Sequence, residues 1–134
     1  MLTNDEFQAW LTAYKSAWEE CDETQIGKIF AQDVTYQETP YTPALKGVDA
    51  IQHYWQSVIV DDQSDILFEY KVWNVSDNIG VAHWRCRFTQ KSSFEGVELD
   101  GIFRCVFSEQ AGSPKKCTEL LAWWHLRKST LGEI

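Results

Sequence analysis

The chain has 134 residues, which is the length of one domain and enough to bury a core without disulfides or metals. Tryptophan, tyrosine and phenylalanine make up 14% of it, which excludes a disordered chain because large apolar side chains offset the entropy lost on folding. The net charge of -8 disfavours nucleic-acid binding, since an acidic chain repels the phosphate backbone. No apolar run approaches the roughly 18 residues that a membrane-spanning helix requires.

The N-terminal residues and the cysteines indicate in which cellular compartment the protein is expected. Residues 1–6 lack the basic start and the apolar stretch of a secretory signal, so we expect a cytoplasmic protein. Four cysteines are spread along the chain without a C-x-x-C pair: Cys21, Cys86, Cys105 and Cys117. Scattered thiols in a cytoplasmic protein indicate buried core residues, so we expect neither a zinc site nor another cofactor.

The first third of the sequence predicts helices. Thr3 and Glu6 have the spacing of a capping box. Apolar residues then recur at steps of three and four, which places them on one helix face: Phe7, Trp10, Leu11, Tyr14, Trp18 and Cys21. Asp22 with Gln25 predicts the start of a second, short helix whose apolar residues are Ile26, Ile29 and Phe30. A short strand is expected over residues 33–37.

A loop and a third helix are expected next. Pro40 and Pro43 predict a loop over residues 38–46, because proline removes a backbone donor and restricts its neighbour. Gly47 precedes a third helix, whose apolar stripe is Ile51, Tyr54, Trp55 and Val58. The acidic stretch 61–65 is expected to end that helix.

The remainder predicts a sheet of four strands. Segments 66–75, 80–90, 97–108 and 117–127 are rich in β-branched and aromatic residues, with turns at 76–78, 92–96 and 110–114. Short turns between successive strands indicate an antiparallel meander. Alternate residues form one apolar face and one mostly charged face, and the helices are the available cover for the apolar face. We therefore expect one α+β domain over residues 1–134, with the helices on one side of a curved antiparallel sheet.

Motifs along almost the whole chain carry a resemblance to a known superfamily. They are Tyr14-x-x-Ala17-Trp18-x-x-x-Asp22, Phe30-Ala31-x-Asp33-Val34-Thr35-Tyr36-Gln37-Glu38-Thr39-Pro40, Gly47-Val48-x-Ala50-Ile51-x-x-Tyr54-Trp55, Leu99-Asp100-Gly101 and Trp123-Trp124. In these residues the chain resembles the nuclear transport factor 2-like superfamily, with its SnoaL-like and ketosteroid-isomerase-like branches. The resemblance implies a cone-shaped, cystatin-like sheet around a hydrophobic pocket, and commonly a homodimer formed through the outer face of the sheet.

The resemblance also implies two catalytic residues. In the ketosteroid-isomerase-like branch, the proton-abstracting carboxylate falls at the position of Glu38, and the phenol that donates to the oxyanion falls at Tyr14. Burial at an aromatic pocket raises the pKa of a carboxyl group, which then serves as a general base. The ketosteroid-isomerase-like branch also uses a third polar group, a protonated carboxylic acid, whose position corresponds to Phe103. The nearest carboxylate, Asp100, is an odd number of residues away and is therefore expected on the opposite sheet face.

We expect the predicted pocket to bind a small hydrophobic molecule. We expect its lining to include six aromatic side chains: Trp18, Tyr36, Trp55, Trp84, Phe103 and Trp124. One hypothesis is an enzyme of the isomerase, cyclase or hydrolase type that uses Glu38 as base and Tyr14 as donor. The alternative is a non-catalytic domain that binds a ligand or only dimerises, which the missing third acid favours.

The charged face of the sheet is the predicted dimer interface. Exposed tryptophans on a sheet face indicate an interface, and charges can pair around them. The residues expected there are Trp73, His83, Arg85, Arg104, Glu119, Trp123 and His125. Two histidines and carboxylates on this face also leave a metal site open, but no helical H-x-x-x-H pattern supports one. An arginine beside two carboxylates would suit a hydrolase, although the motif of the limonene-epoxide-hydrolase branch is not matched.

Overall fold

A computed structural model describes residues 1–109 and 115–130. Its first element is helix α1 (Asn4–Glu19). The predicted capping box is confirmed: the Glu6 amide donates to Thr3 Oγ1 at 3.1 Å, and the Thr3 amide donates to Glu6 Oε1 at 2.9 Å. Each bond satisfies an amide that the first helical turn leaves without a partner. The expected apolar stripe of α1 is buried from Phe7 to Trp18.

The second helical segment is shorter than expected. Asp22 caps the 3₁₀ turn η1 (Glu23–Gln25), which continues into α2 (Ile26–Ile29). Phe30 was expected in this helix, but it begins strand β1 (Phe30–Gln37). The predicted loop also contains a short strand, β2 (Leu45–Lys46), paired antiparallel with β1. Both prolines precede β2, so its backbone donors remain free to pair.

The third helix changes its winding before it ends. Helix α3 (Val48–Trp55) continues as the π turn η2 (Gln56–Val60). A π turn places an extra residue in the helix, so the apolar stripe moves by one position. Ile59 is therefore 4% exposed, whereas Val58, which was expected on the stripe, is 37% exposed.

The sheet has six strands in the order β2-β1-β6-β5-β4-β3. Strands β3 (Gln63–Ser76), β4 (Ile79–Gln90), β5 (Glu95–Phe107) and β6 (Cys117–Thr130) form the predicted antiparallel meander. Strand β1 pairs with β6 in parallel, so the sheet is mixed, with the predicted antiparallel strands forming its larger part. The intervening α3 and meander supply the long crossover that a parallel pair needs. The turn predicted at residues 110–114 lies outside the described residues.

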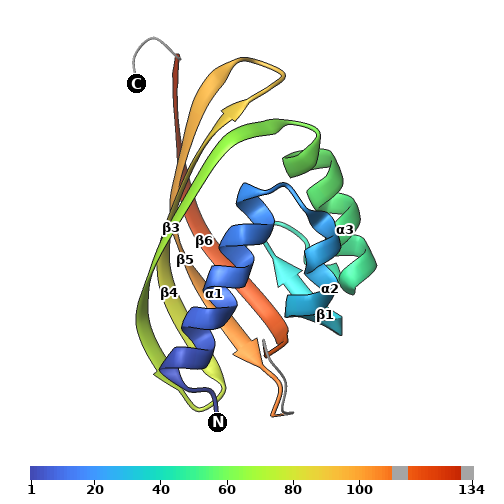
Figure 1. The fold of residues 1–134 in the computed structure, drawn as a ribbon, viewed down its shortest axis with the longest axis vertical. Helices are drawn as coiled ribbons and strands as arrows, with labels where there is room; N and C mark the ends of the chain where they lie inside the picture. The colour runs from blue at the N-terminus through green and yellow to red at the C-terminus, as the bar shows by residue number, and fades with distance from the viewer. Residues whose placement is uncertain (110–114, 131–134) are drawn as a thin grey trace.

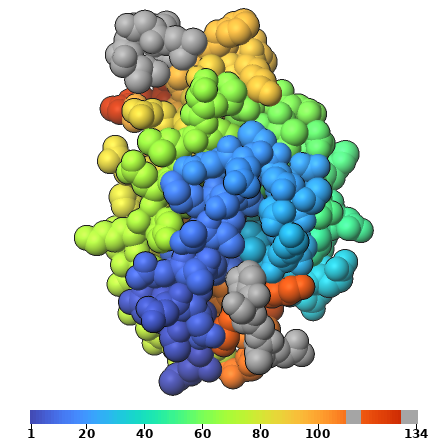
Figure 2. All heavy atoms as spheres, in the orientation of Figure 1, coloured from blue at the N-terminus to red at the C-terminus, as the bar shows by residue number. Residues whose placement is uncertain are grey.

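The helices cover one side of a curved, open sheet, as predicted (Figure 1). In the space-filling view, α1 and α2 occupy the face toward the viewer and β3 borders them (Figure 2). Where α1 meets this edge strand, Glu19 Oε2 accepts the Phe68 amide at 2.8 Å and the Lys15 ammonium at 2.7 Å. Helix α1 thus satisfies backbone groups that an edge strand otherwise leaves open.

Aromatic side chains dominate the core between the helices and the sheet. The Tyr14 ring, 1% exposed, lies within 5.5 Å of the ring centroids of Trp55, Phe68 and Phe103. All four cysteines are free thiols, and Cys21 alone is partly exposed. No helix among the described residues is long and apolar enough to cross a membrane.

Candidate functional site

A cavity of ≈ 160 Å³ lies between the helices and the inner face of the sheet. Strand β1 and its following loop supply Tyr36 and Glu38, while α1 supplies Tyr14 and Trp18. The remaining lining comes from the end of α3, the π turn and the meander: Tyr54, Val58, Ile59, Asp62, Gln63, Phe88, Gln90, Leu99, Trp124 and Leu126. Its walls are therefore mostly aromatic and aliphatic, with a few polar groups between them, which is typical of a small-molecule site.

Glu38 is the central ionisable group of this cavity. It is partly buried at the end of β1, with Oε1 accepting from the Tyr36 hydroxyl at 2.7 Å and Oε2 accepting from the Trp124 indole N–H at 3.2 Å. Burial raises the pKa of Glu38 above its ordinary value of 4.5, although hydrogen bonds from Tyr36, Trp124 and Tyr54 oppose the rise. These donors hold the carboxylate in place, while burial strengthens it as a base.

Two tyrosines connect Glu38 to the core. Burial raises the pKa values of Tyr14 and Tyr36, and the negative charge of Glu38 raises both further. Both hydroxyls therefore remain protonated donors at neutral pH. Tyr36 gives its single proton to Glu38, whereas the Tyr14 hydroxyl belongs to a residue that lines the cavity.

A second carboxylate, Asp62, lies at the cavity on the turn between η2 and β3. The Ser92 amide donates to Asp62 Oδ1 at 2.9 Å, and the Gln90 amide group donates to Oδ2 at 3.2 Å. Partial burial raises the pKa of Asp62, but these bonds outweigh it and leave the pKa below its usual range. The cavity thus holds one carboxylate with a raised pKa and one with a lowered pKa, an arrangement that separates acid and base roles.

The predicted site residues divide between the cavity and the core. Five of them line the cavity: Tyr14, Trp18, Tyr36, Glu38 and Trp124. Trp55, Trp84 and Phe103 were also expected in the lining, but they pack behind it: the Trp84 and Phe103 rings stack at 4.9 Å, and Trp55 meets Tyr14 at 5.5 Å. Aromatic side chains on one apolar sheet face pack partly in the core and partly at the cavity. The period-two alternation therefore does not distinguish core residues from lining residues.

Several lining residues were not predicted as part of the site. Tyr54 was assigned only to the apolar stripe of a helix, and residues 61–65 only to a helix end. Gln63 is in fact a buried residue of β3, and its Oε1 accepts from the Trp18 indole N–H at 2.8 Å. A single polar residue next to a strand does not belong to a hydrophobic pattern, so periodicity does not identify it as buried. The one available signal was its place immediately before the apolar alternation of residues 66–75.

The outer face of the sheet collects the remaining predicted residues. His83 Nε2 lies 2.7 Å from Asp100 Oδ1, and Arg85 Nε lies 3.5 Å from Asp100 Oδ2, so Asp100 is on the expected face. Arg104 pairs with Glu119 at 3.3 Å, and His125 lies opposite Asp100 in the β5–β6 register. These charges pair across strands at the sheet surface.

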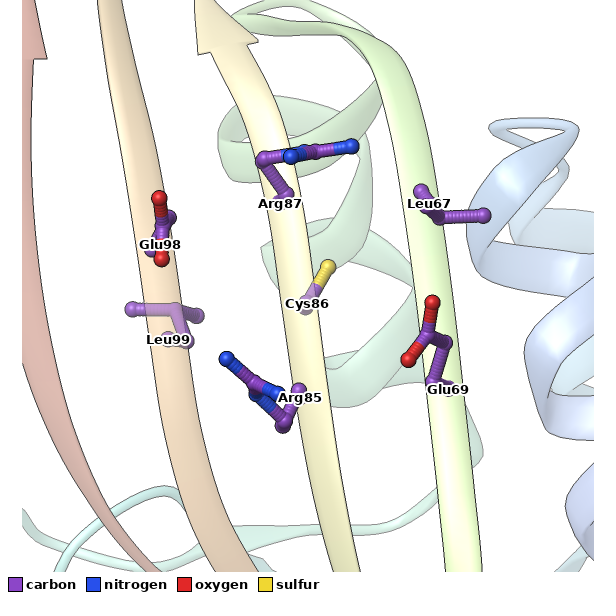
Figure 3. Close-up of a pocket in the computed structure, with 7 residues that line it drawn as sticks. All are labelled: Leu67, Glu69, Arg85, Cys86, Arg87, Glu98 and Leu99. Atoms are coloured by element: carbon purple, nitrogen blue, oxygen red, sulfur yellow. The ribbon is translucent and has the colours of Figure 1, made fainter. Parts of the chain in front are cut away.

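A shallow hollow of ≈ 160 Å³ crosses the outer surface over β3, β4 and β5. Figure 3 shows Arg85 extending toward β5 and Arg87 toward β3, with Glu69 and Glu98 on the flanking strands. Among the described residues, no group of three or more histidine, cysteine, aspartate or glutamate side chains is placed to hold a metal ion.

The sequence profile of the SnoaL-like domain family matches residues 11–112, which is most of the chain. The chain belongs to this family. Comparison with curated protein sequences gives no match. The match agrees with the mixed sheet and the three helices described above.

Solved structures share the SnoaL-like fold at low identity. Hexachlorocyclohexane dehydrochlorinase LinA-type3 from Novosphingobium barchaimii LL02 has a TM-score of 0.77 at 12% identity, covering 97% of this chain and 90% of its own. SalBIII, described as an epoxide hydrolase/cyclase-like enzyme in salinomycin pyran ring formation, has a TM-score of 0.76 at 13% identity, covering 93% and 95%. A ketosteroid isomerase-like protein from Erwinia carotovora atroseptica has a TM-score of 0.67 at 18% identity, covering 90% and 96%. At these identities the likeness concerns the fold.

Proposed function

We propose that this SnoaL-like protein is an enzyme that moves a proton on a small apolar carbonyl compound, with Glu38 as the general base. One observation carries the proposal: Glu38 faces a mostly apolar cavity, burial raises its pKa, and donors hold both of its oxygens. Proteins with this fold include a dehydrochlorinase, a cyclase-like enzyme and an isomerase-like protein, which supports enzymatic use of the scaffold.

In the proposed reaction Glu38 removes a proton from the carbon next to the carbonyl group and becomes a carboxylic acid. The electron pair of the broken C–H bond moves to the carbonyl oxygen, and a protonated phenol at Tyr14 donates a hydrogen bond to the resulting oxyanion. Glu38 then returns the proton to a second carbon, which completes an isomerisation without an oxidant or reductant. Trp124 and Tyr36 position the carboxylate through their hydrogen bonds.

The test measures proton abstraction directly. Cyclic ketones and enones are incubated with the protein in D₂O, and deuterium uptake at the carbon next to the carbonyl is followed by NMR. We expect the wild-type protein to accelerate uptake for at least one compound, and Glu38→Gln to reduce the rate by about 10²-fold or more. The matched control is Glu20→Gln, because Glu20 is an exposed carboxylate at the end of α1. Equal rates for wild type and Glu38→Gln, with both proteins folded, would refute the base role.

A non-catalytic binding domain is the second candidate, and one observation favours it. Phe103 occupies the position of the third acid in the ketosteroid-isomerase-like branch, and its ring stacks on Trp84 in the core. A wild-type protein that binds ring ketones without accelerating deuterium uptake would support this candidate.

We also propose that the outer sheet face forms a homodimer. Trp73 is 55% exposed and stacks on His83, and Trp123 on the same face is 44% exposed. Large exposed aromatic side chains of this kind anchor interfaces, while the surrounding charges fit a polar rim. Light scattering should show a dimer for wild type and a monomer for Trp123→Asp. The control Phe94→Asp changes another exposed aromatic residue, 72% exposed at the β4–β5 turn, and should leave the dimer intact.

A further inference from the structure

We infer that Gln63 is the residue that recognises the ligand, and that the ligand is a neutral compound of one six-membered ring carrying an oxygen acceptor. This inference rests on the proposed use of the cavity as a small-molecule site and specifies its substrate class. Gln63 is 6% exposed and lines the cavity, at the start of β3.

The orientation of the Gln63 amide follows from its partner. An indole N–H can only donate, so the Gln63 atom that lies 2.8 Å from Trp18 Nε1 must be the carbonyl oxygen. The amide nitrogen therefore points away from Trp18. No other described residue accepts a hydrogen bond from this nitrogen. Gln63 lines the cavity, so a ligand oxygen there can accept a hydrogen bond from this amide donor.

The size of the ligand follows from the cavity. An apolar protein cavity of about 150 Å³ holds one benzene molecule, and this cavity has ≈ 160 Å³. Its inner wall cannot retract easily, because Tyr14 and Trp18 pack against Trp55 and Phe68 in a close-packed core. A single six-membered ring fits this space, whereas fused rings would have to displace these aromatic side chains.

The charge of the ligand follows from the lining. Glu38 and Asp62 contribute carboxylates, and no lysine, arginine or histidine lies among the described lining residues. An anionic ligand would lose its hydration beside two negative charges without gaining a cationic partner. A neutral carbonyl oxygen can instead accept from the Gln63 amide at no electrostatic cost.

The experiment compares four ring compounds by ligand-observed NMR titration at pH 8. Cyclohex-2-enone carries the oxygen acceptor, and 1-methylcyclohexene lacks it. Cyclohexanecarboxylate tests charge, and 2-decalone tests a fused second ring. For the wild-type protein we expect cyclohex-2-enone to bind at least tenfold more tightly than the carboxylate or the fused-ring ketone. The inferred ligand class would be overturned if cyclohex-2-enone failed to bind. It would also be overturned if cyclohexanecarboxylate or 2-decalone bound more tightly than cyclohex-2-enone.

Two variants isolate the amide donor. Gln63→Glu keeps an acceptor for Trp18 but removes the N–H donor, and Gln63→Met removes both groups at similar side-chain length. Each should weaken cyclohex-2-enone binding by about tenfold or more while leaving 1-methylcyclohexene within twofold. The control Gln32→Glu makes the same change on an exposed residue of β1 and should alter neither. Equal weakening of both ligands, or of neither, would remove Gln63 from ligand recognition.

The outcome is separable from that of the proposed reaction. Binding is measured without turnover, so loss of Gln63-dependent binding would overturn this inference even if Glu38 still promoted deuterium uptake. Conversely, Gln63-dependent binding without uptake would refute catalysis by Glu38 and leave the ligand class standing.

Discussion

Replacing Tyr36 with phenylalanine tests how the fold sets the basicity of Glu38. The Tyr36 hydroxyl donates to Glu38 Oε1 at 2.7 Å, and the residue is 2% exposed. Phenylalanine retains the ring, which packs edge-on against Phe30 with centroids 5.9 Å apart. The substitution therefore removes one donor to the ionised carboxylate and little else. Because that bond favours the charged form, its loss must raise the pKa of Glu38.

The expected magnitude follows from the strength of such a bond. A hydrogen bond to a charged group contributes about 1.5–3 kcal/mol, and about 1.36 kcal/mol shifts a pKa by one unit. Tyr36→Phe should therefore raise the pKa of Glu38 by about 1 to 2. The pKa of Glu38 is higher in the folded than in the unfolded protein. Such a group contributes to the free energy of unfolding at pH values below its unfolded pKa. That contribution is lost as the pH rises through the folded pKa. The variant should consequently be destabilised more at pH values above the pKa of Glu38 than below it.

Trp124 supplies the assay, because its indole N–H donates to Glu38 Oε2 at 3.2 Å. The ¹⁵N–¹H resonance of this indole group, followed against pH, reports the ionisation of Glu38. Tyr41→Phe is the matched control, since Tyr41 is 100% exposed. A titration midpoint that is unchanged or lower in Tyr36→Phe would refute the reasoning that this hydroxyl stabilises the carboxylate.

Two further predictions concern the sheet that supports the site. Gly101→Ala should destabilise the protein by about 1–3 kcal/mol in chemical denaturation, because the added Cβ would lie 2.7 Å from Trp124 Cβ. Gly27→Ala, whose nearest neighbour is 3.8 Å away, should show no such loss. Glu19→Ala should cost about 1–3 kcal/mol and accelerate hydrogen exchange at the Phe68 amide, which loses its acceptor; unchanged exchange would remove Glu19 from the edge of β3.

The element order could be predicted from the sequence because its signals are local. The capping box at Thr3 and Glu6, the helical stripe through Tyr14 and the period-two alternation of the meander each depend on neighbouring residues. Local signals do not give the limits of a strand where polar residues occupy it. Gln63 begins β3 three residues before the expected start, and its side chain is buried there with its carbonyl oxygen accepting from Trp18.

The parallel pairing of β1 with β6 could not be predicted in this way. It brings together residues far apart in the chain, such as Tyr36 and Leu120, and no local pattern encodes that register. The pairing nevertheless decides the site, because it places Glu38 at the end of β1 within reach of the Trp124 indole on β6.

The sequence by itself determined the fold class, the two faces of the sheet and the candidacy of Glu38, since periodicity and family motifs are read along the chain. Only the tertiary structure decided which aromatic side chains line the cavity and which fill the core, because Trp84 and Trp124 share one sheet face and differ only in depth. It also decided the roles of Asp62 and Gln63. Their chemistry depends on partners from other elements, Ser92 for one and Trp18 for the other, that meet them only when the chain folds.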